Sequence, residues 1–162
     1  MALEFSIRPF IPSDSPAVMD VHQRAILNVP TRFYGRAERE SWAHGMTATA
    51  YAKSAANRDT FIVAETPDDT LVGFCGYRVT EAAGVVCDLF TTPEQQRRGV
   101  GQALLATAEQ SLCEQRVQSV TVKSSLASVS FYEAQGYFVT LRTRHMTRGG
   151  LEIEIRHMEK PV

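Results

Sequence analysis

Two glycines in a polar turn are the residues whose spacing in this chain most clearly suggests chemistry. Gly99 and Gly101 lie between an apolar run and an amphipathic segment, with Arg97 and Arg98 just before them. Glycine lets a ligand approach the backbone closely. The first N–H groups of a helix are unpaired and carry a partial positive charge. A turn of this kind that opens a helix can bind a diphosphate, and the two arginines add charge at its rim.

The turn does not fit two other phosphate-binding motifs. A dinucleotide-binding fingerprint requires a third glycine where this chain has Leu104. A P-loop requires Gly-Lys-Ser/Thr where the chain has Leu104-Leu105-Ala106. For the six residues alone, a plain helix start with surface arginines remains the alternative.

The same segment resembles the acetyl-CoA pyrophosphate signature of the GNAT N-acetyltransferase superfamily. That signature is Gln or Arg, two residues, Gly, one residue, and Gly or Ala, and Gln96, Gly99 and Gly101 match its fixed positions. Residues 89–94 and 102–105 resemble the flanking strand and helix start. The resemblance implies that acetyl-CoA is the co-substrate. The residues that would offer backbone groups to its pantetheine arm are Leu89, Phe90 and Thr91. Those that would hold its pyrophosphate are Gln96, Arg97, Arg98, Gly99, Val100, Gly101 and Gln102.

A second segment, Phe131-Tyr132-Glu133-Ala134-Gln135-Gly136-Tyr137, resembles the late Phe-Tyr-Glu-x-x-Gly-Phe motif of that family. The resemblance implies that Tyr132 is the general acid. When an amine expels a thiolate from a thioester, a phenol with a pKa of about 10 is protonated at neutral pH and can donate to the sulfur. The local sequence alone also allows Tyr132 to be a core aromatic residue.

The family's cofactor-binding Asn is absent from its usual place before this tyrosine. The corresponding residue is Ser125, and Ser128 follows at the start of the next expected helix. A serine hydroxyl makes a similar hydrogen bond with a shorter reach. Ser125 and Ser128 are therefore the candidate cofactor contacts here.

The attacking amine must lose a proton, and the carboxylate nearest to the glycine turn is Asp88. The strand expected over 117–122 carries no acid. Asp88 is the candidate base, although strand alternation could also point it away from the cleft. Glu81, His22 and His44 are weaker candidates, for which the sequence favours a turn residue and two helix-surface residues. Proton loss to water is the remaining alternative.

The elements that must position these residues alternate between strand and helix. Apolar and turn patterns predict strands near 5–7 and at 60–65, 71–79, 85–90, 117–123, 137–142 and 151–157, and helices at about 16–28, within 31–57, around 104–112 and at 128–135. This order indicates an α/β fold with a mixed sheet. The resemblance makes it a GNAT-like sheet of about seven strands with flanking helices, splayed between the strands at 85–91 and 117–123. No linker or repeat divides residues 1–162, so one acyl-CoA N-acyltransferase domain is expected.

Composition limits the classes of molecule that the protein can be expected to bind. The 17 basic and 18 acidic residues give a net charge of −1, which argues against nucleic acid and membrane surfaces. The three cysteines form neither a disulfide framework nor a metal-binding knuckle, so no metal is expected. The sequence shows no signal peptide or membrane span, so a cytoplasmic location is expected.

The function expected from the resemblance is transfer of acetyl from acetyl-CoA to a primary amine by direct attack in a ternary complex. The acceptor is a small-molecule or peptide amine, which the mixed charges of the helical joint at 28–42 do not select. The joint contains Trp42, for which core packing is favoured. A non-catalytic acyl-CoA sensor or regulatory module, a longer acyl donor and a hydroxyl acceptor remain alternatives. A homodimer through the alternating Leu151, Ile153 and Ile155 is also suggested.

Overall fold

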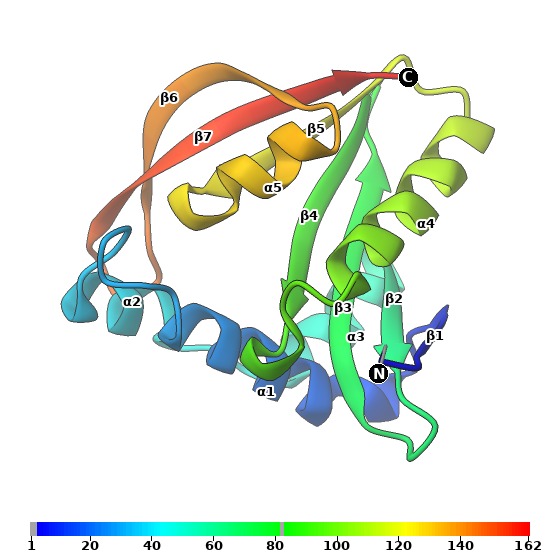
Figure 1. Cartoon of the computed structure of the whole chain (residues 1–162), viewed down its shortest axis with the longest axis horizontal. Coiled ribbons are helices and arrows are strands. Elements are labelled where there is room, and N and C mark those ends of the chain that lie inside the picture. Colours follow the sequence, from blue (N-terminus) through cyan, green and yellow to red (C-terminus); the bar gives the residue numbers. More distant parts are fainter. Residues whose placement is uncertain (1–2, 82) are drawn as a thin grey trace.

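One seven-stranded sheet organises the molecule (Figure 1). The computed structural model describes residues 3–81 and 83–162. The strands are β1 (Ser6–Pro9), β2 (Thr60–Glu65), β3 (Leu71–Val79), β4 (Ala83–Thr91), β5 (Ser119–Ser125), β6 (Phe138–Met146) and β7 (Glu152–Pro161). Their order across the sheet is β1-β2-β3-β4-β5-β7-β6, and β4–β5 is the parallel pair in a sheet of antiparallel neighbours. The expected α/β fold with a mixed sheet of about seven strands is confirmed.

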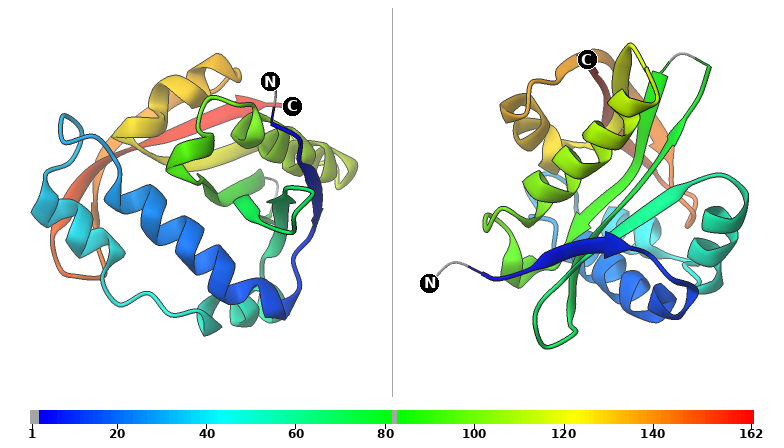
Figure 2. Two further views of the ribbon diagram at one scale, coloured as in Figure 1. Left: turned by 60° about the horizontal axis from the view of Figure 1, so that its bottom comes forward. Right: turned by 90° about the vertical axis from the view of Figure 1, so that its right-hand side faces the viewer.

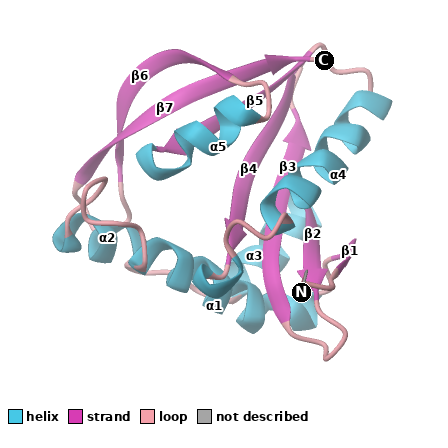
Figure 3. Cartoon of the chain, in the orientation of Figure 1, coloured by secondary structure: helices cyan, strands magenta, loops and turns pink. Residues whose placement is uncertain are grey.

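Within the described residues, five α-helices flank the sheet (Figure 3). They are α1 (Ser15–Leu27), α2 (Arg36–Ala43), α3 (Thr49–Asn57), α4 (Val100–Glu114) and α5 (Val129–Ala134). Two short 3₁₀ turns, Pro93–Gln95 and Leu126–Ser128, lead into α4 and α5. Each helix start that the sequence predicted from glycine, proline or apolar spacing lies within a few residues of the observed one.

The helices cover both faces of the sheet (Figure 2). On one face, Leu104, Leu105, Ala108 and Leu112 of α4 are buried, because their spacing places them on a single side of the helix. On the other face, Val18 and Val21 of α1 pack with Phe61 and Phe74 of the sheet. The two apolar clusters hold β3 and β4 between them.

The central strands β4 and β5 pair over only part of their length. Their register runs from Ala83 opposite Ser119 to Val86 opposite Val122. Beyond that point β4 stays paired with β3 as far as Thr91, and β5 with β7 as far as Ser125. Figure 1 shows the two strands diverging from their shared end. The inner edge of each strand is therefore open, as the resemblance implied.

The last two strands differ from the prediction. Both extend further at their C-terminal ends than the apolar pattern indicated, β6 to Met146 and β7 to Pro161. In the added length of β6, Arg144 Nε forms a cross-strand ion pair of 3.1 Å with Glu152 Oε2 of β7. Ile153 and Ile155 pack against Tyr34 in the chain's own core, while Leu151 is exposed. The apolar face suggested for a homodimer is thus already covered in the monomer. Among the described helices, none combines the length and apolarity needed to cross a membrane.

Candidate active site

A cleft of about 560 Å³ opens where β4 and β5 separate. Its walls come from the end of β4, the start of α4, α5 and the connection between α1 and α2. Eleven of the residues predicted from the sequence line it: Leu89, Phe90, Thr91, Gln96, Arg97, Gly99, Gly101, Gln102, Ser125, Ser128 and Tyr132. Segments far apart in the sequence therefore converge on one concave surface.

The glycine turn forms one end of this cleft. Gly99 is the N-cap of α4 with φ +84°, and Arg97 has φ +64°. The first helical hydrogen bond runs from the Ala103 N–H to the Gly99 carbonyl over 3.0 Å. The N–H groups of residues 100–102 precede it, which leaves them without an intrahelical acceptor. The turn thus has the donors that a phosphate group requires.

Three turn residues differ in what they present to the cleft. Gly101 leaves room at the cleft wall, since a Cβ there would lie 3.6 Å from the Phe131 ring. The Val100 side chain packs in the core beside Leu104, so its backbone alone is free for a ligand. Arg98 is exposed and does not line the cleft.

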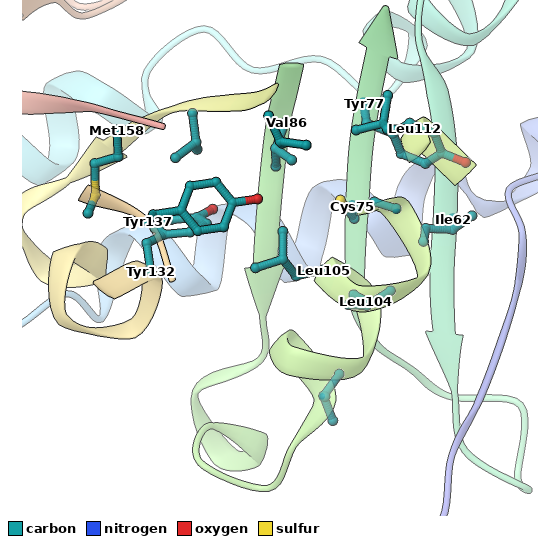
Figure 4. Close-up of a cluster of buried hydrophobic side chains, with 14 of the residues drawn as sticks. Ile62, Cys75, Tyr77, Val86, Leu104, Leu105, Leu112, Tyr132, Tyr137 and Met158 are labelled. Atoms are coloured by element: carbon teal, nitrogen blue, oxygen red, sulfur yellow. The ribbon is translucent and has the colours of Figure 1, made fainter. Parts of the chain in front are cut away.

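Tyr132 lies on α5, and its ring reaches toward β4. The residue is buried, and the rings of Phe131 and Tyr137 meet it edge-on at 5.2 and 5.4 Å. Figure 4 shows Tyr132 and Tyr137 in the core between α5 and β4, on the side of Leu105. Burial raises the pKa of Tyr132 far above the usual 10, so the phenol stays protonated in neutral solution.

A smaller hollow of about 50 Å³ adjoins the cleft and brings the two predicted catalytic residues together. Asp88 of β4 and Tyr132 both line it, together with Trp42. Burial, and then the charge of Asp59, raise the pKa of Asp88 from 3.8 to about 6. A carboxyl and a phenol with separated pKa values can serve as base and acid. Among the described residues, groups of His, Cys, Asp and Glu that could hold a metal ion do not occur.

The two candidate serines lie where β5 ends. The Ser125 hydroxyl donates to the Ser128 hydroxyl over 3.3 Å. The next backbone N–H, that of Leu126, donates to the Tyr34 hydroxyl over 2.8 Å, and Tyr34 donates in turn to the Glu154 carbonyl over 2.5 Å. Tyr34 therefore joins the α1–α2 connection to the splayed end of β5.

His22 was expected on the helix surface, and this was wrong. Its ring is buried beneath Phe90, 4.2 Å between centroids, and its Nδ1 lies 2.8 Å from the Tyr51 hydroxyl. Burial lowers the pKa of His22 to about 3, so the ring is neutral. The other two weak candidates, His44 and Glu81, are exposed.

Trp42 lines both the cleft and the small hollow, in addition to packing edge-on against Tyr34 at 5.8 Å. The turn between β6 and β7 holds this end of α2. The Arg148 guanidinium donates to the Trp42 and His44 carbonyls, at 2.5 and 3.0 Å, and the Gly149 N–H donates to the Ser41 carbonyl at 2.9 Å. No local pattern in the sequence indicates this contact, because it joins residues about a hundred positions apart.

Comparisons with known proteins agree with this geometry. The family model described as acetyltransferase (GNAT) domain matches residues 24–160. A GCN5-related N-acetyltransferase structure from Rhodopseudomonas palustris is similar, with a TM-score of 0.88, 20% identity, and 100% of this chain and 98% of that chain covered. The PaiA N-acetyltransferase of Thermoplasma acidophilum in complex with coenzyme A has a TM-score of 0.78 and 21% identity, over 99% of this chain and 100% of that chain.

A third similar structure is a GNAT superfamily phosphinothricin acetyltransferase from Sinorhizobium meliloti in complex with AcCoA. Its TM-score is 0.76 and its identity 13%, over 98% of this chain and 88% of that chain. No curated protein sequence matches this chain significantly. The family model covers most of the chain, and the seven-stranded sheet has the fold of these structures. This chain therefore belongs to the GNAT acetyltransferase family.

Proposed function

We propose that the protein transfers an acetyl group from acetyl-CoA to a primary amine by direct attack in a ternary complex. The observation that carries this proposal is the position of Asp88 and Tyr132 on one small hollow beside the cleft. A base and an acid on the two sides of one reacting centre are what amine attack on a thioester requires.

The open edge of β4 and the free N–H donors at the start of α4 support acetyl-CoA as the occupant of the cleft. The pantetheine arm would lie along the open edge of β4 at Leu89, Phe90 and Thr91, which do not pair with β5. It would pair with the backbone there as an added strand does. The pyrophosphate oxygens would accept hydrogen bonds from the free N–H groups at the start of α4. Two structures of similar fold hold coenzyme A or AcCoA, which supports this assignment.

The chemistry then follows from the two pKa values. Above a pH of about 6 Asp88 is ionised and can take a proton from the attacking amine. The nitrogen forms a bond to the thioester carbonyl carbon, and the carbon–sulfur bond then breaks. Tyr132 donates its proton to the leaving sulfur, which becomes the free thiol of coenzyme A. Tyr132 recovers a proton from solvent or from Asp88.

The cysteines give little support to a covalent acetyl-enzyme. Cys75 is fully buried in the core. Cys87 lines the small hollow, but burial and the Asp59 charge raise the pKa of its thiol to about 11. The thiolate is the nucleophilic form of cysteine, and it is scarce at neutral pH under these conditions. Direct attack by the amine is therefore the simpler route.

The acceptor would enter past the α1–α2 connection. Phe33, Trp42 and Phe90 line this side of the cleft, and Arg32 lies over the Phe33 ring at 4.6 Å. The charged side chains of the helix that follows, α2, bond to one another or to nearby backbone; they are those of Arg36, Glu38, Arg39 and Glu40. The wall is aromatic with one cation, which suits a small-molecule amine or a peptide end.

A panel assay tests the proposal. Release of free thiol is measured with small amines, amino acids and peptides as acceptors, each with acetyl-CoA and with longer acyl-CoA donors. We expect acceptor-dependent release that is fastest with acetyl-CoA and a primary amine. Tight binding of acetyl-CoA without release by any acceptor would favour the non-catalytic sensor instead. Faster release with hydroxyl acceptors or longer acyl groups would refute the amine or the acetyl assignment.

A further inference from the structure

A second carboxylate lies buried beside Cys87, the residue that precedes Asp88 in β4. Asp59 precedes β2, and its side chain is 4% exposed. Its Oδ1 lies 3.2 Å from Arg78 Nη1 and 3.5 Å from Arg58 Nε. The Cys87 thiol donates to the same oxygen over 3.9 Å. Two guanidinium groups and one thiol therefore surround a single buried carboxylate.

A bulge in β4 places Asp88 on the same side of the sheet as this carboxylate. Tyr77 pairs with Val86 and Gly76 with Asp88, which leaves Cys87 as an extra residue. Val86 packs with α4 on one face of the sheet. Gly76 faces the Phe61 ring on the other face, and Asp88 lies opposite Gly76. The extra residue therefore places Cys87 and Asp88 on the side of Asp59, since bulges re-aim side chains.

We infer that Asp59 is a positioning residue whose negative charge prepares Asp88 to accept the proton of the amine. This inference rests on the proposed function, in which Asp88 is the base. Nothing in the motif pattern pointed to Asp59, which reaches the site only through the fold of β2, β3 and β4.

The charges around Asp88 act in both directions. Burial has the largest effect on its pKa, and the charge of Asp59 is the next largest; both raise it. The guanidinium groups that lower it are Arg148 from the β6–β7 turn, Arg58 after α3 and Arg78 of β3. Tyr51 of α3, Tyr132 of α5, Cys75 and Cys87 are neutral neighbours, because their own pKa values are raised. The resulting pKa of about 6 suits a base at neutral pH.

Two substitutions with opposite charge effects test the inference. Asp59→Asn removes the negative charge with little change in shape. The acid limb of the pH profile of kcat/KM should then move down by about half a unit to one unit. Arg78→Gln removes a positive charge from the same ion pair and should move the limb up. Asp69→Asn is the matched control, because Asp69 lies in the β2–β3 turn with φ +63°, a conformation that Asn also adopts. The acid limb of the pH profile of this variant should not move.

Damage to the ion pair alone would affect both Asp59→Asn and Arg78→Gln in the same direction, and that result would overturn the inference. The carboxyl pKa of Asp88 is also followed directly by NMR of ¹³C-labelled aspartate, with Asp88→Asn used for the assignment. A lower pKa of Asp88 in Asp59→Asn, with an unmoved kinetic limb, would support the coupling and reject Asp88 as the base. An unchanged pKa of Asp88 in Asp59→Asn would overturn the inference itself.

Discussion

Burial acts on Tyr132 and Asp88 in the same direction and suits each to a different task. A raised pKa keeps the Tyr132 phenol protonated, so that it can donate a proton. Burial, together with the charge of Asp59, brings the pKa of Asp88 to about 6, close enough to neutral pH for efficient proton removal. The two residues reach one hollow from β4 and α5.

Replacing Tyr132 by Phe should lower turnover by about 10²–10⁴-fold, because it removes the proposed proton donor and keeps the ring. Binding of acetyl-CoA should stay within about twofold, since the interaction is made mainly in the transition state. Steady-state kinetics with a saturating amine and calorimetric titration measure the two effects. Tyr137→Phe is the control, because Tyr137 is also buried but donates to Glu109 over 2.9 Å. Near-normal turnover of Tyr132→Phe would mean that water or another residue protonates the sulfur.

The buried His22 should make the fold sensitive to acid. Its pKa is about 3 in the folded protein and 6.5 without burial, so between these values the unfolded chain binds the extra proton. Unfolding is then favoured as the pH falls, by up to about 1.4 kcal/mol per pH unit. Asp88 opposes this between 3.8 and 6, because its folded pKa is raised and the folded protein binds the proton first.

Comparison with His22→Asn separates the two effects, since Asp88 contributes equally to both proteins. The unfolding free energy of the wild type minus that of the variant should decrease by about 1.4 kcal/mol per unit from pH 6 to pH 4. Urea unfolding at several pH values measures it. The exposed His44→Asn serves as control. A difference independent of pH would show that His22 is accessible to protons in the folded state.

At the scale of elements, the turn before α4 contains two residues in the left-handed backbone region. Glycine adopts this region without steric cost, whereas arginine does not. Gly99 and Arg97 both have positive φ, at +84° and +64°. For a residue with a Cβ this region is unfavourable by about 1–2 kcal/mol. Strain of this kind is found at functional sites. Arg97 lines the cleft, so we expect its side chain to contribute to ligand binding and thereby to compensate for the strain.

Arg97→Gly should therefore separate stability from affinity. The free energy of unfolding without ligand should rise by about 0.5–1 kcal/mol, because the relief of about 1–2 kcal/mol of strain outweighs the larger chain entropy that glycine gives the unfolded state. The affinity for acetyl-CoA should fall several-fold as a charge at the phosphate site disappears. Chemical unfolding and calorimetric titration measure these quantities, with the exposed Arg98→Gly as control. A variant that binds acetyl-CoA as tightly as the wild type would remove Arg97 from the binding site.

The sequence predicted those elements whose signals are local. The spacing of Leu104, Ala108 and Leu112 identified α4, and the glycine turn identified its start. The burial of His22 and the contact of Arg148 with α2 depend on segments that meet only in the folded chain, so no local pattern could show them. For the same reason no local pattern pointed to Asp59. Tyr132 and Asp88 could be predicted as candidates, the first from a motif and the second from its position near the glycine turn, and their catalytic roles stay predictions.

At the scale of the whole molecule, the homodimer remains a prediction without its original support. Ile153 and Ile155 are buried against Tyr34, so Leu151 is the residue of that set that stays exposed. Exposed apolar side chains on the outer strand β6, namely Phe138, Leu141 and Met146, are the remaining candidates. Light scattering at micromolar concentration should give twice 18.0 kDa if the chain dimerises. A mass of 18.0 kDa would reject the dimer.

The cleft depends on the fold of the whole molecule, because it lies where the two halves of the sheet separate. Gly101 offers a way to block it without strain in the backbone. A Cβ at this position would lie at ordinary contact distance, 3.6 Å from Phe131 and 3.8 Å from Thr91. Gly101→Val should therefore fold and place its methyl groups where the pyrophosphate would lie. Ala106→Val, on the exposed side of α4, is the matched control.

The most direct test of the account follows the acetyl group itself. Acetyl-CoA labelled with ¹³C in the acetyl group is incubated with the best amine of the panel, and the products are analysed by mass spectrometry. The wild type and Ala106→Val should yield one labelled acetyl on the amine nitrogen for each coenzyme A released, and Gly101→Val should yield at least about tenfold less. Labelled acetate in place of the amide, or undiminished transfer by Gly101→Val, would contradict acetyl transfer to an amine through this cleft.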